Sequence, residues 1–167
     1  AMLVGITLSD VIDQYLRGIS VVATTTLLFG LLLGVSYSYR AAGADEQPIS
    51  RLDHALLIGL AQAFALIPGT SRSGVTITMS LFLGYNLATA ARFSFLMSIP
   101  VIAGALLVML VKESQLFFSS ANLILTLSAM FMAAVSSYVT IAFFVGLVTR
   151  IGMMPFVIYR VLLALIL

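Results

Sequence analysis

The sequence predicts an all-α polytopic membrane protein, and three observations lead to that class. Of the 167 residues, 62% are hydrophobic and only 8% are charged, and the mean hydropathy is +1.19. Soluble domains carry about a quarter charged residues. Several apolar segments reach the ~20 residues that a helix needs to cross a bilayer. One further apolar segment is broken by a Pro-Gly-Thr-Ser-Arg-Ser-Gly sequence. We therefore expect transmembrane helices plus one re-entrant helix hairpin, in a single integral-membrane domain over residues 1–167.

The first expected transmembrane helix covers residues 19–39, an apolar segment bounded by Arg17 and Arg40. Within it, Gly30 and Gly34 form a small-xxx-small pair of the kind that lets helices pack closely. The same pair is consistent with two glycines placed by chance in a helix that tolerates them. If the pair does pack, the partner is another helix of the chain or a second copy in a homodimer.

Residues 54–84 form the expected re-entrant hairpin. At about 1.5 Å per residue each apolar arm is ~20 Å or less, which is shorter than the ~30 Å hydrocarbon core. The whole segment is too long for one crossing and too short for two, so a hairpin that returns to the side it entered fits best. One broken spanning helix is the alternative. His54, at the start of the segment, is expected to be a surface residue rather than a catalytic base.

Three more helices complete the expected fold. Residues 88–111 and 121–148 are long enough to cross the membrane, and residues 155–167 form a last helix that is short for a crossing. Arg160, inside this last helix, is expected to extend toward the interface, with a contact to the site as the alternative. Because the short apolar stretch at the start of the chain looks like the end of a longer helix, we expect the chain to be part of a larger protein.

The break in the hairpin, Pro68 to Gly74, has the chemistry of an anion site. Pro68 ends the first half-helix because its ring cannot continue the hydrogen-bond ladder. Gly69 and Gly74 allow a tight turn and a close approach of the backbone to a ligand. The second half-helix is expected to begin near Ser73 or Gly74, with its free N–H groups and positive dipole end at the turn.

Side chains in and after the break strengthen this prediction. Arg72 carries a planar fork that matches phosphate oxygens, and an arginine at bilayer depth costs at least roughly 2.5 kcal/mol, so a partner is expected. Ser71, Ser73 and Thr76 supply hydroxyl donors, and Thr70 lies between them. Two structural alternatives stay open: either serine is only a helix N-cap, or Arg72 pairs with a carboxylate. Physical chemistry alone indicates an anion site in a membrane and does not choose between hydrolysis and transport.

The segment Pro68-Gly69-Thr70-Ser71-Arg72-Ser73-Gly74-Val75-Thr76 resembles the Pro-Gly-x-Ser-Arg-Ser-x-x-Thr motif of the undecaprenyl-diphosphate phosphatases, the bacitracin-resistance family. Further stretches are similar to that family along nearly the whole chain: Gln62, Arg92-Phe93-Ser94-Phe95-Leu96 with Pro100, and Pro155-Phe156-Val157-Ile158-Tyr159-Arg160. The motif is specific in this membrane setting.

The resemblance implies a multi-pass enzyme of the bacterial inner membrane. Its substrate would be undecaprenyl diphosphate, a polyprenyl diphosphate lipid held among membrane lipids, and its product would return the lipid carrier to peptidoglycan synthesis. The implied fold is one half of an inverted-repeat, transporter-like fold, with a site open to the periplasm. Arg72 and Ser71 would be catalytic, Arg72 clamping the diphosphate. Gly69, Thr70, Ser73, Gly74 and Thr76 would bind substrate.

The sequence departs from the family in its acidic residues. The family's glutamate-rich motif and Ser-Ser-Thr-Gly-His stretch do not occur, and the carboxylates lie in expected loops or at segment ends. The family implies a divalent cation, Mg²⁺ or Ca²⁺, whose ligands we expect outside this chain; no metal ligand is assigned here. We therefore expect the C-terminal half of the enzyme, inactive without the missing N-terminal half.

Other functions compete with this one. A flippase or transporter of a polyprenyl phosphate, or of another anion, would need no catalytic base, and a purely structural membrane module would use Arg72 only to pair helices. The chain has no cysteine, and its eight basic residues are scattered, so nucleic-acid binding is not expected. The loop charges place Arg17 and Lys112 outside and Arg51 and Arg150 in the cytoplasm.

Overall fold

In the computed structural model, residues 16–39, 47–112 and 120–167 are described. The regular structure in these ranges is helical, without a strand. Three helices are long and apolar enough to cross a membrane, Ile19–Tyr39, Leu87–Lys112 and Leu123–Ile151. The predicted all-α polytopic membrane class is therefore confirmed. The helices are α2 (Ile19–Tyr39), α3 (Leu52–Ala61), the 3₁₀ helix η1 (Gln62–Leu66), α4 (Arg72–Phe82), α5 (Leu87–Lys112), α7 (Ser120–Ile151) and α8 (Met154–Ile166). The short apolar stretch that starts the chain lies outside the described residues.

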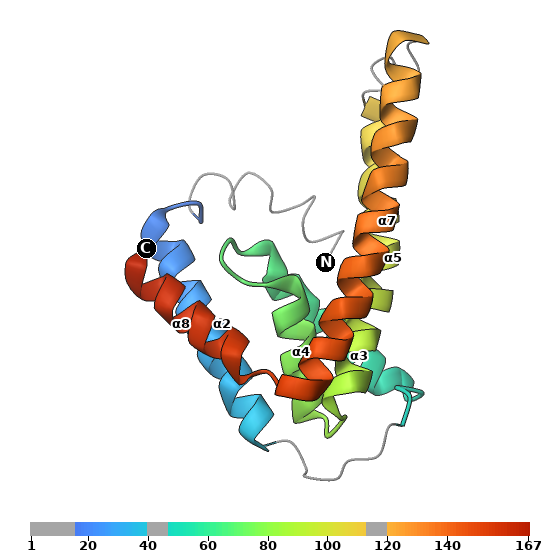
Figure 1. The fold of residues 1–167 in the computed structure, drawn as a ribbon. Coiled ribbons are helices and arrows are strands. Elements are labelled where there is room, and N and C mark those ends of the chain that lie inside the picture. Colours follow the sequence, from blue (N-terminus) through green and yellow to red (C-terminus); the bar gives the residue numbers. More distant parts are fainter. Residues whose placement is uncertain (1–15, 40–46, 113–119) are drawn as a thin grey trace.

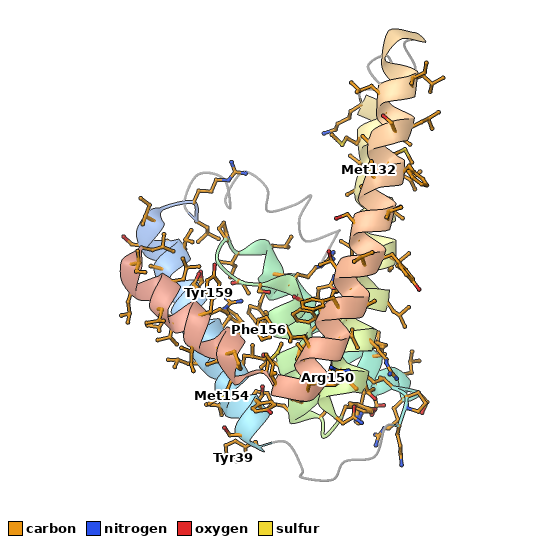
Figure 2. All side chains as sticks on the ribbon, viewed as in Figure 1. Tyr39, Met132, Arg150, Met154, Phe156 and Tyr159 are labelled. Carbon is orange, nitrogen blue, oxygen red and sulfur yellow. The ribbon has the colours of Figure 1, made fainter. Side chains whose placement is uncertain are left out.

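Two helix pairs flank a central hairpin (Figure 1). Helix α2 packs against α8, and α5 packs against α7. Helix α4 packs against both α2 and α5 and so joins the two pairs. The α5–α7 pair extends well beyond the other helices (Figure 1), and Met132 lies on that extension of α7 (Figure 2). The extension is covered with exposed apolar side chains, as a lipid-facing surface requires.

The segment from α3 to α4 folds back on itself. His54 Nδ1 and Tyr85 Oη, which belong to its two ends, are hydrogen-bonded at 2.9 Å, and their rings meet edge to face at 5.6 Å. The two ends therefore lie together, which excludes a single broken helix running in one direction. The arms have 10 residues in α3, 5 in η1 and 11 in α4, too few for either to cross a bilayer. Insertion of this hairpin into the membrane from one side stays a prediction. His54 stays partly exposed at the start of α3, which agrees with the expectation of a surface residue, and its ring contacts Tyr85.

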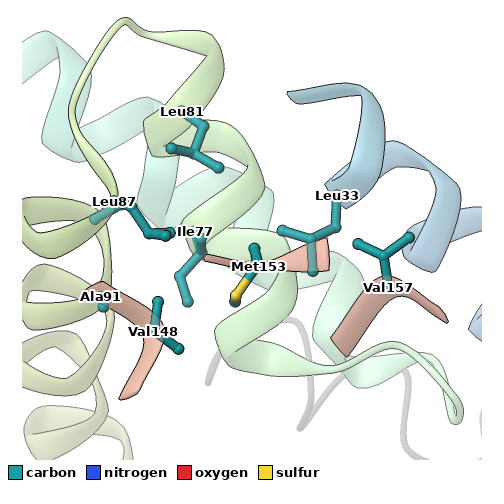
Figure 3. Close-up of a cluster of buried hydrophobic side chains, with 9 residues drawn as sticks. Leu33, Ile77, Leu81, Leu87, Ala91, Val148, Met153 and Val157 are labelled. Atoms are coloured by element: carbon teal, nitrogen blue, oxygen red, sulfur yellow. The ribbon is translucent and has the colours of Figure 1, made fainter. Parts of the chain in front are cut away.

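The buried core centres on α4. Figure 3 shows a cluster of apolar side chains that come from α2, α4, α5, α7 and α8. Ala90 and Ala91 of α5 are fully buried, and their small side chains let α5 approach α4 closely. Phe144 of α7 extends the cluster, with ring contacts to Phe95 at 5.6 Å and to Phe156 at 5.2 Å. The core residues are Leu33, Ile77, Leu81, Leu87, Ala90, Ala91, Val148, Met153 and Val157.

Gly30 and Gly34 pack within the chain. A side-chain carbon built on Gly30 would lie 3.2 Å from Arg160 Cβ, and one built on Gly34 would lie 3.1 Å from Val157 Cγ1. Both neighbours belong to α8, so the absence of side chains on α2 is what allows the two helices to approach. Since α8 occupies this face, the alternative of a homodimer formed through these glycines is wrong.

The helix directions agree with the predicted sidedness of the loops. The end of α2, the start of α5 and the end of α7 lie at one end of the molecule, and the start of α2 and the end of α5 point the other way (Figure 1). Arg150 and Tyr39 both lie at the first of these ends (Figure 2). The tip of the hairpin points away from that end (Figure 1).

Candidate functional site: the hairpin tip and its cavity

The tip of the hairpin is a tight turn between η1 and α4. Ile67 is extended, with φ −76° and ψ 123°, as expected for a residue before proline. The Thr70 N–H closes the turn by donating to the Ile67 carbonyl at 3.1 Å. Gly69 has φ +87°, a left-handed conformation in which any other residue would be strained. Pro68 and Gly69 therefore reverse the chain, as their residue types predict.

Helix α4 begins at Arg72, slightly earlier than the sequence suggests. Ser71 is extended, and its Oγ accepts from the Gly74 N–H at 3.1 Å, so Ser71 is the N-cap. Its hydroxyl also lies 3.3 Å from Ser73 Oγ. Among the described residues, the backbone N–H groups of Arg72 and Ser73 have no acceptor. The start of α4 thus keeps two unpaired donors at the positive end of a helix dipole.

A cavity of about 560 Å³ lies against this tip. Its polar wall comes from the tip and the start of α4, and its other walls come from α2, α7 and α8. Phe156 and Tyr159 lie on the α8 wall (Figure 2). The cavity therefore joins a polar end to an apolar one. Its lining is Val22, Thr26, Leu33, Gly69, Thr70, Ser71, Ser73, Gly74, Phe144, Met153, Phe156, Tyr159, Arg160, Leu163 and Leu167.

Arg160 turns toward this cavity, which corrects the expectation that it extends to the interface. Its Nη2 donates to the Gly69 carbonyl at 2.8 Å, and its Nη1 lies 3.3 Å from where a side chain on Gly74 would begin. Arg160 lies near the middle of α8, on the wall of the cavity that faces the hairpin tip. The alternative, a contact between Arg160 and the site, is the one that the structure shows.

Two buried polar atoms at the site have no hydrogen-bond partner. They are Thr70 Oγ1 and Arg160 Nε, the two such side-chain atoms in the part of the chain that the structure describes. Thr70 is only 7% exposed, and both residues line the cavity. An unpaired buried donor costs about 1–3 kcal/mol, and more when it is charged. A ligand with several acceptor oxygens would remove that cost.

Of the predicted site residues, the structure brings five to the cavity: Gly69, Thr70, Ser71, Ser73 and Gly74. Arg72 and Thr76 do not line it. They are four residues apart and therefore share one face of α4, and that face meets α5, where Thr76 Oγ1 and Ser94 Oγ are 2.6 Å apart. Thr76 is fully buried there, and its role as a substrate ligand stays a prediction.

Arg72 itself has neither a side-chain hydrogen bond nor an ion pair with any described residue. The alternative that it pairs with a carboxylate therefore has no support within these residues. One ion pair among the described residues joins Arg51 Nη2 to Asp53 Oδ2 at 2.6 Å, at the exposed start of the hairpin. The role of Arg72 as a diphosphate clamp stays a prediction.

The cavity lining does not fit a divalent cation directly. Mg²⁺ and Ca²⁺ prefer several carboxylate and carbonyl oxygens, whereas the polar side chains here are hydroxyls and a guanidinium. The Gly69 carbonyl at the site already accepts from Arg160 and Thr26. Within residues 16–39, 47–112 and 120–167, no three His, Cys, Asp or Glu side chains come together. The donor set instead suits an anion.

The fold and the site together define a class, a polytopic helical membrane protein with a cavity at the break of a helix hairpin. Comparison with known families makes this specific: the chain belongs to the family described as bacitracin resistance protein BacA, whose model matches residues 1–166.

Three curated relatives are each named undecaprenyl-diphosphatase. The protein of Teredinibacter turnerae is 48% identical over all of this chain. Those of Saccharophagus degradans and Alcanivorax borkumensis are 44% and 47% identical over 98% of it. The chain spans 62%, 60% and 61% of the length of these three relatives.

Proposed function

We propose that this chain is the diphosphate-binding part of a membrane phosphatase that hydrolyses undecaprenyl diphosphate to undecaprenyl phosphate and phosphate. The observation that carries the proposal is the cavity at the hairpin tip, where Thr70 Oγ1 and Arg160 Nε are buried without a partner. The names of the relatives supply the substrate. The product would return the lipid carrier to peptidoglycan synthesis in the bacterial inner membrane.

The tip would bind the diphosphate from two sides. On the cavity side, the Arg160 guanidinium and the Ser71 and Ser73 hydroxyls face one space with the start of α4. On the other face of α4, Arg72 has no partner among the described residues. Two guanidiniums and a helix N-terminus would offset the negative charge of the diphosphate, and phosphoryl transfer needs this stabilisation most.

The apolar end of the same cavity suits the polyprenyl chain. Leu33, Phe144, Phe156 and Leu163 line it within the same space as the polar tip. An amphiphilic ligand would therefore have its headgroup at the tip and its first isoprene units against α7 and α8. This arrangement matches a lipid diphosphate better than a small free anion, which would leave the apolar walls without contacts.

The described residues provide no general base at the tip. Ser71 Oγ contacts Gly74 N and Ser73 Oγ, and no carboxylate or histidine lines the cavity. The base, and the carboxylates for the Mg²⁺ or Ca²⁺ that we propose as cofactor, would come from the part of a family member that this chain does not cover. In the resulting enzyme the site would open to the periplasm.

Phosphate release from a polyprenyl diphosphate in proteoliposomes tests the proposal. The chain would be assayed alone and together with the part of a relative that this chain does not span. Each arrangement would be run with Arg72 and with Arg72→Ala. We expect release only from the combination, and a fall of roughly 10- to 100-fold for Arg72→Ala, the value of a charged hydrogen bond. Tight binding without release in any arrangement, provided that the parts associate, would favour transport of the lipid instead.

A further inference from the structure

Three consecutive threonines of α2 differ in what their hydroxyls contact. Thr24 Oγ1 donates to the Ser20 carbonyl at 2.7 Å, within its own helix. Thr25 Oγ1 lies 2.6 Å from the Pro68 carbonyl, and Thr26 Oγ1 lies 3.2 Å from the Gly69 carbonyl. Two neighbouring side chains of α2 therefore hold two consecutive carbonyls of the hairpin tip.

The shortest contact of the Thr25 hydroxyl is the one to the tip. The carbonyls of Val21 and Val22 lie 2.8 and 3.1 Å away, and both are longer contacts than the one to Pro68. A hydroxyl has a single proton to donate, and the Pro68 carbonyl has no other donor among the described residues. Loss of this hydroxyl would leave that carbonyl unpaired.

These contacts fix the direction of the peptide planes at the tip. In a trans peptide the carbonyl and the following N–H point in opposite directions, and the described residues contain no cis bond. Holding the Pro68 carbonyl toward α2 therefore directs the Gly69 N–H away from α2. Gly69 fits so closely that a side chain on it would overlap the Thr25 hydroxyl and the Val22 carbonyl.

The same hydrogen-bond network includes the Arg160 guanidinium. The Gly69 carbonyl accepts from Thr26 Oγ1 and, at 2.8 Å, from Arg160 Nη2. Thr26 and Arg160 also line the cavity together with Thr70. A shift of the tip away from α2 would therefore move the arginine and the start of α4 relative to each other.

We propose that Thr25 and Thr26 are positioning residues of the diphosphate site. Their hydroxyls hold the Pro68 and Gly69 carbonyls so that Arg160 and the start of α4 converge on one headgroup. The inference rests on the proposed function, because only a ligand held at the tip makes this convergence matter.

Affinity for a diphosphate separates a positioning role from a structural one. The chain in lipid nanodiscs would be titrated with inorganic diphosphate and with farnesyl diphosphate, and its unfolding temperature would be measured in parallel. Thr25→Val with Thr26→Val removes both hydroxyls at nearly constant shape. Thr25→Ser with Thr26→Ser keeps both hydroxyls, and Thr24→Val is the matched control on the same helix.

We expect the valine pair to bind both diphosphates roughly tenfold more weakly, since two neutral hydrogen bonds contribute at about this level. The serine pair should stay within about twofold of the wild type, and Thr24→Val should bind as the wild type does. If the valine pair does not fold, Thr25→Val and Thr26→Val alone make the same comparison, each with a smaller loss.

Three other binding results would overturn the positioning role or the proposed function. If the wild type binds the diphosphates and the valine variants bind them with the same affinity, the positioning role is overturned and the proposed function stands, whatever the unfolding temperatures are. Weak binding by the serine pair equal to that of the valine pair also overturns it, because the hydroxyls would then not be the cause. A wild-type chain that binds neither diphosphate overturns the proposed function and this inference with it.

Discussion

Replacing Gly69 by alanine tests how tightly the hairpin tip fits against α2. Alanine at φ +87° is strained by about 1–2 kcal/mol. In addition, its Cβ would overlap the Thr25 hydroxyl and the Val22 carbonyl, so the tip must move away from α2. That movement breaks the hydrogen bonds from Thr25 and Thr26, at about 1 kcal/mol each. We expect a total loss of about 3–4 kcal/mol in the free energy of unfolding.

Two other glycines separate the cost of backbone strain from the cost of the overlap with α2. Gly84 has φ +89° but nothing within 4 Å of an added side chain, so Gly84→Ala should lose only the strain of about 1–2 kcal/mol. Gly59 lies inside α3 with open space around it, so Gly59→Ala should gain up to about 1 kcal/mol from helix propensity. The assay is denaturant unfolding of all three variants in detergent micelles. A loss for Gly69→Ala no larger than that for Gly84→Ala would show that the tip does not touch α2.

Three further predictions concern other parts of the molecule. Gly34→Ala should lower the free energy of unfolding by about 1–3 kcal/mol, because the added side chain pushes α8 away. Gly146→Ala, in α7 with open space around it, should not lower it, and equal effects of the two changes would refute the α2–α8 contact. Thr76→Val should leave Ser94 Oγ buried without its 2.6 Å partner and cost about 1–3 kcal/mol. Thr76→Val with Ser94→Ala should cost less than the two changes added together, and a loss of diphosphate affinity without a loss of stability would instead make Thr76 a ligand. The hydrogen bond from Arg51 lowers the pKa of Asp53 to about 2, so the stabilisation from this pair is present above the ordinary carboxyl pKa and is lost as the pH falls through about 2. Arg51→Gln should therefore raise the pKa of Asp53 in an NMR titration. The free energy of unfolding at neutral pH should change little, because the pair is exposed.

The hairpin could be predicted from the sequence because each of its parts has a local cause. Pro68 cannot donate a helical hydrogen bond, Gly69 can adopt a positive φ, and Ser71 can cap the helix that follows. None of these properties depends on distant residues. The lengths of the two apolar arms were sufficient to exclude two complete crossings.

The composition of the site could be predicted only in part, because contacts between distant segments decide the rest. Arg160 lies 91 positions from Gly69 in the chain, and nothing local indicates that its Nη2 reaches that carbonyl. The contact from Thr25 to Pro68 spans 43 positions in the same way. Helical periodicity alone could have separated Arg72 and Thr76 from Ser71 and Ser73, because residues four apart share a face.

The central claim is that a diphosphate binds at the hairpin tip beside Arg160, and the most direct test is the distance between phosphorus and the guanidinium nitrogens. Solid-state NMR of the chain in lipid bilayers, with ¹⁵N-labelled arginine and farnesyl diphosphate, measures this distance through the ³¹P–¹⁵N coupling. A charged hydrogen bond predicts a phosphorus–nitrogen distance of about 4 Å. Arg160→Lys should abolish the part of the coupling that comes from the cavity, and Arg72→Lys should abolish the part that comes from the other face of α4. Strong coupling that survives Arg160→Lys unchanged, or no coupling in a chain that binds the ligand, would contradict the claim.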